Sequence, residues 1–510
     1  MIFIALSPIL WLIVALTVMH MSAWKACSIA LLVAWAASLG IYGMTPLHAA
    51  EATLEGAALA CWPILLVIIA AIFTYNLSLH TKSMDTIKQM LTSVSSDKRV
   101  LILLIGWGFG SFLEGMAGFG TAVAIPAGML AGLGIPPLLA ASVCLIANSV
   151  PTAYGSIGIP LVTLGSVTGV PSSQLALYTA LQLAPLSLLC PFIMTIVTGK
   201  SLKALHGMIS YCLAAGLGFL LPELVVAAFL GPELAVIAGS IGAMGAIVLC
   251  AKAFPLHDPA YAMDALGNAP AVDARKGLLA WLPFILIFVF LLVTSKLVPV
   301  LHDPLNLIKT SVLIYDGADG APYTFTWVAT PGVLIFLAAF LGGHMQGAGM
   351  GEMLSVLKTT IINLRFTIVT IITVIATAKV MGYAGMTFDI ATTAVAATGT
   401  LYPTVAAFIG SIGTFITGSA TSSCVLFGKL QTDSAVAIGA SEAGQAWLAA
   451  ANATGACAGK MISPQSIAIA VGAIGVKGCD SKLLSFAVKI YVPFILIMGA
   501  IVYFGFSVLE

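Results

Sequence analysis

Glu114 and Lys460 are the two side chains of this sequence whose type and surroundings point most directly to chemistry on a charged solute. Each stands in a long apolar, glycine-rich stretch, where an ionised group at the centre of a membrane costs on the order of 2.5–3.5 kcal/mol. Burial favours the neutral form of a carboxyl group, so Glu114 can bind and release a proton. Lys460 can attract an anion beside the exposed amides of a broken helix. The alternatives are a structural acid bonded to backbone amides and a lysine that extends to the membrane surface.

Further polar side chains lie in the same stretches. Asn148 and Asn452 can each donate and accept hydrogen bonds, which suits a carboxylate or hydroxyl group of a solute and equally suits unwound backbone. Thr421, Ser422 and Ser423 place hydroxyl groups around an expected helix break. These hydroxyls can contact a solute, or they can serve only the close packing of helices. The pattern indicates a binding site and leaves open which of these residues form it.

Residues 110–160 must position Glu114. This stretch is apolar enough for a bilayer but too rich in glycine, proline and small polar residues for a plain spanning helix. Glycine and proline free backbone groups from helical hydrogen bonding, and in a membrane such groups persist only inside protein or beside a water-filled cavity. The stretch therefore predicts a broken, re-entrant segment at a transport site.

A second stretch, residues 410–475, resembles the first and predicts an internal repeat. The aligned positions are 112–115 with 415–418, Ala147-Asn148 with Ala451-Asn452, and Pro160 with Pro464. Coincidence between two glycine-rich helices is the alternative. Paired interrupted hydrophobic segments, one in each half, are typical of the site of a secondary transporter.

The two stretches differ at their ionisable positions. Glu114 aligns with Thr417, and Lys460 aligns with Ser156. Each half therefore contributes one ionisable group that the other half lacks. We interpret the acid as a proton site and the base as the cation for an anionic substrate.

The composition sets the class of protein. With 60% hydrophobic and 8% charged residues and a mean hydropathy of +1.11, the chain is far from a soluble domain, in which about a quarter of residues are charged. Its net charge of +1 gives no basic face for nucleic acid. We therefore expect a polytopic membrane protein whose surroundings are the lipid bilayer. The oligomeric state is not predicted.

Motifs for other classes of protein are missing from the sequence. The nine Cys form no CxxC pair and the seven His show no ligand spacing, so no metal or cofactor is expected. Thr198-Gly199-Lys200-Ser201 resembles the end of a phosphate loop, but Met194 stands where glycine is required. No HExxH or GxSxG motif occurs. The sequence therefore favours neither an ATP-driven pump nor an enzyme.

Apolar runs of roughly 20 residues predict an all-α fold with about 11–14 membrane segments. We divide it into a first half (1–254), a connecting loop (255–277) and a second half (278–510). Each half is expected to hold one repeat, with a re-entrant hairpin and a broken helix, and the two repeats are expected to be inverted.

The basic loop 80–99 sets the expected orientation. Because loops rich in Lys and Arg stay in the cytoplasm, this loop is expected inside, loop 45–57 outside and the N-terminus outside.

Three segments resemble the signature segments of the L-lactate permease family: LEGMAGFGTAVAIPA (113–127), CLIANSVPTAYGSIGIP (144–160) and AANATGACAGKMISPQSIAIA (450–470). The similar layout covers nearly the whole chain, and the most specific match, 459–466, contains Lys460, Ser463 and Gln465. The resemblance implies that Ser463 and Gln465 join the substrate site. It also implies a bacterial inner-membrane importer of L-lactate, often also of D-lactate and glycolate, driven by proton symport. It further suggests kinship with transporters of inverted repeats and hairpins that can work as elevators.

One segment departs from the family pattern. The family usually reads Gly-Ser-Asp-Thr-Ser-Ser-Asn, and this chain has Ala420 and Cys424 in place of the acid and the amide. The substrate could therefore be another small organic anion, such as a keto acid, a sulfonate or a dicarboxylate, and sodium coupling stays open. A membrane-embedded enzyme and a passive channel are rival classes. The sequence favours a symporter of a small 2-hydroxymonocarboxylate with protons.

Overall fold

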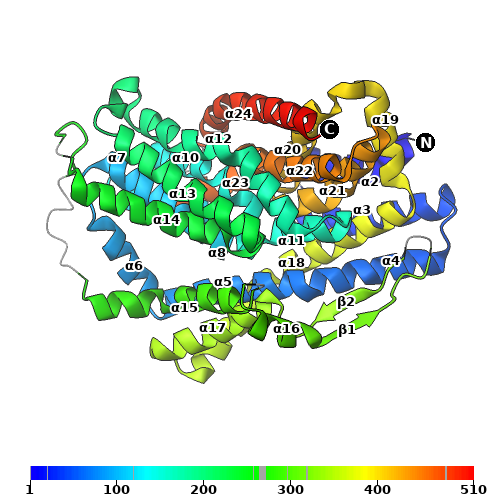
Figure 1. Cartoon of the computed structure of the whole chain (residues 1–510), viewed down its shortest axis with the longest axis horizontal. Helices are drawn as coiled ribbons and strands as arrows, with labels where there is room; N and C mark the ends of the chain where they lie inside the picture. Colours follow the sequence, from blue (N-terminus) through cyan, green and yellow to red (C-terminus); the bar gives the residue numbers. More distant parts are fainter. Residues whose placement is uncertain are drawn as a thin grey trace.

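The computed structural model describes residues 2–19, 21–118, 120–256, 258–263, 272–295, 297–317, 320–476 and 479–510. Over these residues the fold is almost wholly helical (Figure 1), which confirms the predicted all-α membrane protein. Ten helices in the described part are long and apolar enough to cross a membrane, or up to twelve if each of two bent pairs is one span. This number overlaps the lower part of the predicted range.

The first half contains the elements up to Ala253. In chain order they are α1 (Ile2–Ala5), α2 (Ser7–Ile13), η1 (Val14–Val18), α3 (Ala23–Gly40), α4 (Pro46–Leu59), η2 (Ala60–Leu65), α5 (Leu66–His80), α6 (Ser83–Thr92), α7 (Lys98–Leu101), η3 (Ile102–Phe109), α8 (Gly110–Met116), α9 (Thr121–Gly132), α10 (Pro137–Asn148), η4 (Pro151–Tyr154), α11 (Gly155–Thr168), α12 (Ser172–Gly199), η5 (Leu202–Leu205), α13 (Ile209–Phe229) and α14 (Pro232–Ala253).

The second half contains the remaining elements. They are α15 (Ala274–Val293), α16 (Pro299–Leu307), β1 (Lys309–Val312), β2 (Tyr323–Thr326), α17 (Pro331–Met345), α18 (Met350–Tyr383), α19 (Met386–Thr398), η7 (Gly399–Leu401), α20 (Tyr402–Thr417), α21 (Ala420–Ala437), α22 (Glu442–Ile462), α23 (Pro464–Ile474) and α24 (Asp480–Leu509). Part of the predicted connecting loop 255–277, residue 257 and residues 264–271, lies outside the described residues.

Residues 45–57, predicted as a loop on the outer side, are mostly helix, so the predicted loop is wrong. The expected orientation stays a prediction. Thr45 accepts a hydrogen bond from the backbone N of His48 (3.1 Å) and caps α4. Pro46 suits the first helical turn because it needs no donor there. The chain continues through η2, where Trp62 has non-helical backbone angles, into α5, and Pro46–His80 forms one candidate span of 35 residues.

A short antiparallel hairpin interrupts the helical fold between α16 and α17. Lys309 on β1 pairs with Thr326 on β2. Trp62 of η2 donates its indole N–H to the Thr326 carbonyl (2.9 Å) and accepts a hydrogen bond from the Tyr323 hydroxyl. The hairpin thus lies against η2.

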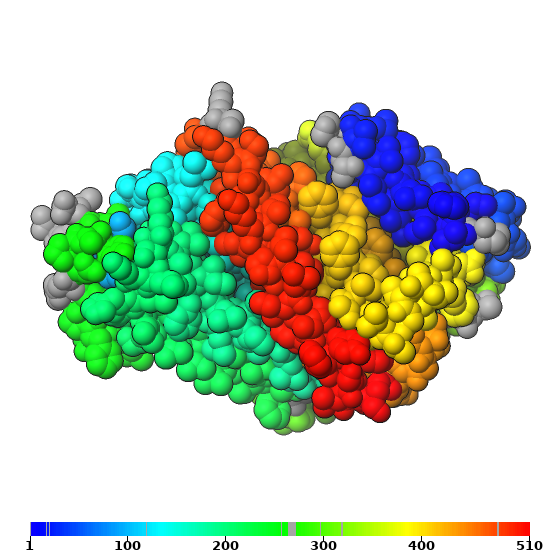
Figure 2. Space-filling view, turned by 90° about the horizontal axis from the view of Figure 1, so that it is seen from above, coloured from blue at the N-terminus to red at the C-terminus, as the bar shows by residue number. Residues whose placement is uncertain are grey.

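The helices form two groups. In the group we call the peripheral helices, α18 packs against α3 and α4, and α17 packs against α5 and α15. In the group we call the repeat helices, α20 and α21 pack against α22, α11 against α21, α9 against α23, and α13 between α12 and α14. Figure 2 shows α24 crossing one face between the helices of the first half and the yellow segment around residue 400.

The order of elements in the repeat helices is the same in both halves. An arm (α7, η3 and α8, or α20) is followed by a returning helix (α9 or α21), a bent pair (α10 and α11, or α22 and α23) and a long helix (α12 or α24). The bends are 61° and 45°. The arms begin at Lys98 and Tyr402, earlier than the predicted 110 and 410. This order suits the predicted repeat, which stays a prediction.

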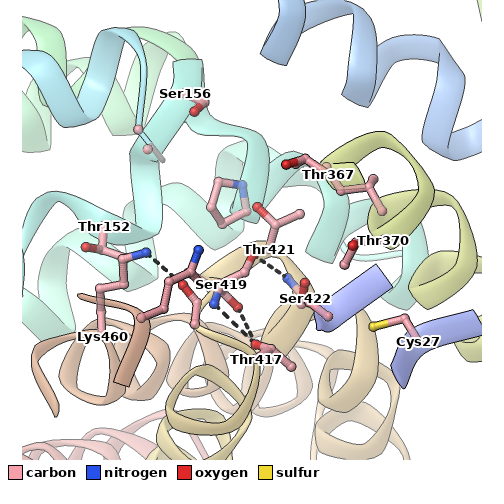
Figure 3. Close-up of a pocket in the computed structure, with 18 of the residues that line it drawn as sticks. Cys27, Thr152, Ser156, Thr367, Thr370, Thr417, Ser419, Thr421, Ser422 and Lys460 are labelled. Atoms are coloured by element: carbon pink, nitrogen blue, oxygen red, sulfur yellow. Dashed lines mark hydrogen bonds between the residues drawn. The ribbon is translucent and has the colours of Figure 1, made fainter. Parts of the chain in front are cut away.

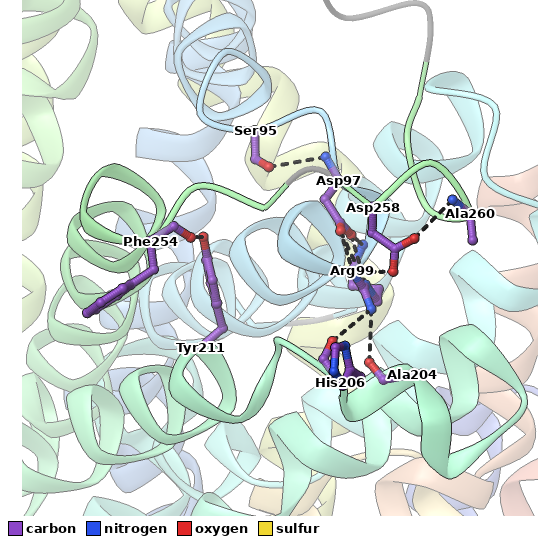
Figure 4. Close-up of polar contacts among 9 residues, drawn as sticks. All are labelled: Ser95, Asp97, Arg99, Ala204, His206, Tyr211, Phe254, Asp258 and Ala260. Carbon is purple, nitrogen blue, oxygen red and sulfur yellow. Dashed lines mark hydrogen bonds and ion pairs between the residues drawn. The ribbon is translucent and has the colours of Figure 1, made fainter.

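A buried arginine fixes the start of the first arm (Figure 4). Arg99 is 1% exposed and binds both oxygens of Asp97, with Nη2 at 2.7 Å from Oδ2. Its Nη2 also pairs with Asp258 at 3.3 Å, and its Nη1 donates to the carbonyl oxygens of Ala204 and His206. The arginine therefore joins three segments with all of its charge paired.

Candidate functional site

Two helix breaks face each other at the centre of the repeat helices. Gly118 and Gly120 (φ +60° and +86°) separate α8 from α9, and Gly418 (φ +70°) separates α20 from α21. These positive angles favour glycine, since a side chain there is strained. A Cβ at Gly118 would lie 2.4 Å from Oγ of Ser156, and one at Gly418 would lie 1.9 Å from Oε1 of Gln465. Each break thus needs glycine for its conformation and for the space around it.

A pocket of about 140 Å³ lies between these breaks (Figure 3). Since liquid water takes about 30 Å³ per molecule, this is room on the order of a few waters, the scale of a small organic acid. The repeat helices line most of it, and the peripheral helix α18 and the N-terminal segment line the rest. Glu114 aligns with Thr417 in the predicted repeat, and Lys460 aligns with Ser156. All four of these residues line the pocket.

Glu114 is a buried acid with unmet hydrogen-bonding capacity. It is 4% exposed, and its Oε2 has no hydrogen-bond partner among the described residues. Its Oε1 lies so close to Gly155 that a Cβ there would be 2.6 Å from it. The first turn of α11 therefore leaves space for this carboxyl group, and a pocket-facing acid without a partner can exchange a proton.

Lys460 is a buried cation near the end of α22. It is 7% exposed, and its Nζ donates to the carbonyl oxygen of Gly418 (2.8 Å). An ammonium group has three donors, so this bond leaves two for a solute. Glu114 is close enough for the two charges to interact, although no ion pair within 4.0 Å joins them in the described structure. The pocket thus holds one acid and one base that are not locked together.

The backbone beside the pocket is strained. Ser156, Ile157 and Gly158 all have positive φ values, of 48°, 58° and 74°. For a β-branched residue such as Ile157 this conformation is an outlier that costs on the order of 1–3 kcal/mol. The Ser156 hydroxyl stabilises this backbone conformation by donating a hydrogen bond (2.7 Å) to the carbonyl oxygen of Ala117, at the break between α8 and α9. Such strain is concentrated at binding and switch regions.

Five of the nine predicted site residues line the pocket: Glu114, Lys460, Thr421, Ser422 and Gln465. The other four lie outside its lining: Asn148, Asn452, Ser423 and Ser463. No ligand contact of any of the nine is shown, so their roles stay predictions.

The residues outside the lining are engaged with neighbouring backbone and side chains. Asn148 donates to the Thr152 hydroxyl (2.6 Å) at the end of α10. Asn452 donates to the Ser423 carbonyl (3.3 Å), and the Ser423 hydroxyl donates to the Gly410 carbonyl (2.6 Å). Ser463 caps α23. The bond of Asn452 matches the alternative that the amides hold closely packed backbone. Oδ1 of Asn148 has no hydrogen-bond partner among the described residues.

Several pocket residues were not singled out from the sequence. Thr152 and Ser419 line it from the repeat helices. Cys27 of α3 and Thr367 and Thr370 of α18 line it on the right of Figure 3. Threonines in apolar helices are too common to be a signal. Ser419 and Thr152 stand beside a Gly-rich or Pro-containing break, which is the feature that could have indicated them.

The two departures from the family pattern have different surroundings. Ala420 is the first residue of α21 and lines the pocket. Cys424 is fully buried one turn further along and does not line it. The missing acid therefore changes the pocket itself, and the missing amide changes the packing behind it.

Three other charged residues of the apolar helices have partners. Lys379 pairs with Glu55 (2.6 Å), Lys429 pairs with Asp433 (3.0 Å), and Asp389 accepts from the Tyr42 hydroxyl (2.7 Å). Such pairs indicate structural roles.

His48, Glu51 and Asp316 also come together, with ligand atoms within 4.8 Å of one another. Nε2 of His48 lies 3.3 Å from Oδ1 of Asp316. The sequence predicts no metal site, and an imidazole N–H and a carboxylate make such a contact without a metal.

Comparison with known proteins gives a consistent result. The profile of the family described as L-lactate permease matches residues 1–509. An L-lactate permease of Streptococcus iniae is 42% identical over 85% of this chain and 90% of that protein. Glycolate permease GlcA and an L-lactate permease, both of Escherichia coli (strain K12), are 32% and 34% identical, each over 98% of this chain and 94% of the relative.

Among solved structures, the crystal structure of the Alcanivorax borkumensis YdaH transporter is similar to this chain at a TM-score of 0.36 and 14% identity. The match covers 79% of this chain and 85% of the other. At this TM-score the likeness does not place individual elements.

Proposed function

The chain belongs to the L-lactate permease family, and from this premise we propose that it imports L-lactate, and also D-lactate and glycolate, together with protons. The proposal rests on the pocket that Glu114 and Lys460 both line. Oε2 of Glu114 has no hydrogen-bond partner among the described residues, and Lys460 has one hydrogen bond, to the Gly418 carbonyl. Neither a passive channel nor an enzyme would need a buried acid and a buried base between two helix breaks.

The charges of the pocket explain how proton and substrate favour each other. In this proposal, Glu114 is ionised in the empty pocket and balances the charge of Lys460. When Glu114 takes up a proton, Lys460 is left without a counter-charge, and a carboxylate of the substrate replaces it. The pocket is neutral in both states, which avoids the cost of a net charge at membrane depth. Because coupling between two sites is reciprocal, bound substrate in turn favours the proton on Glu114.

The lining suits a 2-hydroxymonocarboxylate. The carboxylate would meet Lys460 and the first turn of α21, whose helix dipole favours an anion. Thr421, Ser422 and Gln465 would meet the hydroxyl group. Leu16 and Ile371 offer an apolar contact for the methyl group of lactate, which glycolate lacks.

The protein is a multi-pass membrane protein. We propose a bacterial inner membrane, with the basic segment 80–99 in the cytoplasm and the N-terminus outside. The stretch that connects β1 and β2 then lies on the outer side, since its Asp316 contacts His48 in the first turn of α4.

The test is uptake of labelled L-lactate into proteoliposomes with an imposed inward proton gradient, with and without an uncoupler. We expect accumulation that the uncoupler abolishes. Accumulation that follows an imposed sodium gradient instead would contradict proton coupling, and equilibration without accumulation would indicate a channel.

A second candidate substrate class rests on Ala420, because this residue removes an acid from the pocket that the family usually carries. Without that acid the pocket has more space and repels an anion less, which would suit a keto acid, a sulfonate or a dicarboxylate. Competition of labelled lactate uptake by these acids separates the candidates. Inhibition by a dicarboxylate at lower concentration than by unlabelled lactate would favour the second class.

A further inference from the structure

Glu223 on α13 is a second buried acid, and the sequence does not single it out. It is 0% exposed, and neither of its carboxyl oxygens has a hydrogen-bond partner among the described residues. No Lys, Arg or His of the described structure forms an ion pair with it. An isolated charge in such surroundings is costly, so this carboxyl group holds a proton at rest.

The contacts of Glu223 in the described structure do not explain why an acid stands at this position. α13 and α14 pack closely here: a Cβ at Gly239 would lie 3.3 Å from Cβ of Glu223. A buried polar group without partners destabilises a fold, and an apolar side chain of similar shape would pack at least as well. Arg99, by contrast, is held by two carboxylates and two carbonyl oxygens. Glu223 is therefore explained better by function than by stability.

Glu223 does not line the substrate pocket, but α14 connects it to the helix that carries Glu114. A Cβ at Gly239 of α14 would lie 3.3 Å from Cβ of Glu223, and a Cβ at Gly115 would lie 3.1 Å from Cγ1 of Ile237 in α14. Gly115 follows Glu114 directly in α8. One turn of α14 thus contacts both of the helices that carry the acids.

A second cavity, of about 210 Å³, lies at the turn between α13 and α14. Leu230 and Gly231 line it together with residues that flank the hairpin, among them Ala329. Leu230 follows Glu223 by seven residues, which is about 10 Å along a helix. This cavity opens on the end of the molecule that we assign to the outer side, where the protons of an inward gradient come from.

We propose that Glu223 is a proton-relay residue that receives a proton from the side of this second cavity and passes it to Glu114. The inference rests on the proposed proton symport. In each transfer the carboxyl O–H of Glu223 gives its proton to water between the two acids, and that water gives a proton to the Glu114 carboxylate. Glu223 is then reprotonated from the cavity side. Water is needed because no direct hydrogen bond joins the two acids in the described structure.

The test is Glu223→Gln, which keeps the size of the side chain but cannot release a proton. A relay changes rates, and it does not change the final coupling of substrate to protons. We therefore expect proton-driven lactate uptake to slow by about tenfold or more, with the same final accumulation. Exchange of labelled for unlabelled lactate at equal pH should stay unchanged, because it needs no net proton movement. The solvent isotope effect of uptake in D2O should rise, because proton delivery becomes limiting.

Glu442→Gln is the control, since it removes an exposed acid from the first turn of α22, away from the second cavity. If uptake and exchange of Glu223→Gln fall together, the residue is structural, and if neither changes, the relay is wrong. A lower final accumulation would also overturn it, because Glu223 would then be a coupling site itself.

Infrared difference spectra separate this inference from the proposed function. The carbonyl stretch of a protonated buried carboxyl group should be lost in Glu223→Gln whatever the substrate is. If the wild-type protein does not accumulate lactate but this band is present, the substrate or the coupling ion is wrong and Glu223 is still a protonated site. If the band is absent from the wild-type protein, the relay fails while lactate uptake can stand.

Discussion

Arg99 and Lys460 are both cations in the interior of this protein, but their surroundings differ. Arg99 binds Asp97 and Asp258 and two carbonyl oxygens, and it joins the start of the first arm to two loops (Figure 4). Lys460 has one hydrogen bond, to a carbonyl oxygen at a helix break, and faces a pocket (Figure 3). Both are nearly inaccessible to solvent, at 1% and 7%.

The difference shows how to separate structure from function among buried charges. For a fully paired charge, the free-energy cost of desolvation is offset by partners within the protein, so a ligand adds no further stabilisation. A charge with free donors, such as that of Lys460, or an acid with a free oxygen, such as Glu114, has its partners completed only when a solute or a proton arrives. We therefore expect substitutions in the two regions to change different measurements.

The largest effect is expected for Glu114→Gln. The glutamine keeps the size of the acid next to Gly155 but cannot take up or release a proton. Lactate accumulation under a proton gradient should be abolished, while exchange of labelled for unlabelled lactate is partly retained, because the substrate still finds Lys460 unopposed. Uptake and exchange are measured in the same proteoliposomes.

Glu352→Gln is the control for this prediction, since Glu352 is an exposed acid that caps the start of α18. Normal accumulation by Glu114→Gln would remove Glu114 from the proton site and would weaken the contrast between the two regions.

Lys460→Gln should weaken substrate binding by about 10- to 100-fold. A hydrogen bond to a charged group contributes about 1.5–3 kcal/mol, and each 1.4 kcal/mol is tenfold in affinity. The measurement is the concentration of lactate that half-saturates exchange. Lys429→Gln is the control, because Lys429 already pairs with Asp433 on the same helix. An equal loss in both variants would show that a lysine in this region acts only on the fold.

Ala420→Asp should have a smaller effect, of roughly threefold, on the pH dependence of lactate uptake. The added carboxyl group would line the pocket at the first residue of α21. Once ionised, above about pH 4 unless burial moves its titration upward, it repels a carboxylate. Half-saturating lactate concentrations should therefore rise more steeply with pH than in the wild-type protein. Ala420→Asn, of the same size without the charge, should not show this. A flat profile in the aspartate variant would mean that position 420 does not contact the substrate.

The sequence was sufficient to find the pocket because ionisable residues in apolar stretches are rare. Glu114 and Lys460 were identified from their surroundings and from the positions that break the repeat, and both line the pocket. Asn148 and Asn452 carry the same donor and acceptor groups as a binding residue, and only the tertiary structure shows that their partners are Thr152 and the Ser423 carbonyl.

The second wall of the pocket could not be predicted in this way. It comes from α18, with Thr367 and Thr370, which are far from the repeats in sequence and belong to the peripheral helices. The helix at 46–59 was missed for a related reason: Glu51 and Glu55 lower its hydropathy, and the pairing of Glu55 with Lys379 that makes its burial possible is visible only in three dimensions. Glu223 was missed because it lies in an apolar run outside the repeats.

The smallest effect on transport, and a large one on stability, is expected for Arg99→Gln. Removing one partner of a buried ion pair costs about 3–5 kcal/mol because the other charges are left unpaired, here those of Asp97 and Asp258. The melting temperature of the purified protein should fall, while half-saturating lactate for the folded fraction stays within about twofold of wild type. Arg99→Lys should recover part of the stability, since a lysine keeps the charge but not the two-oxygen contact with Asp97. A change in lactate affinity in Arg99→Gln at normal stability would contradict the separation of paired from unpaired charges, because a fully paired cation at the start of the arm would then act on the substrate from outside the pocket.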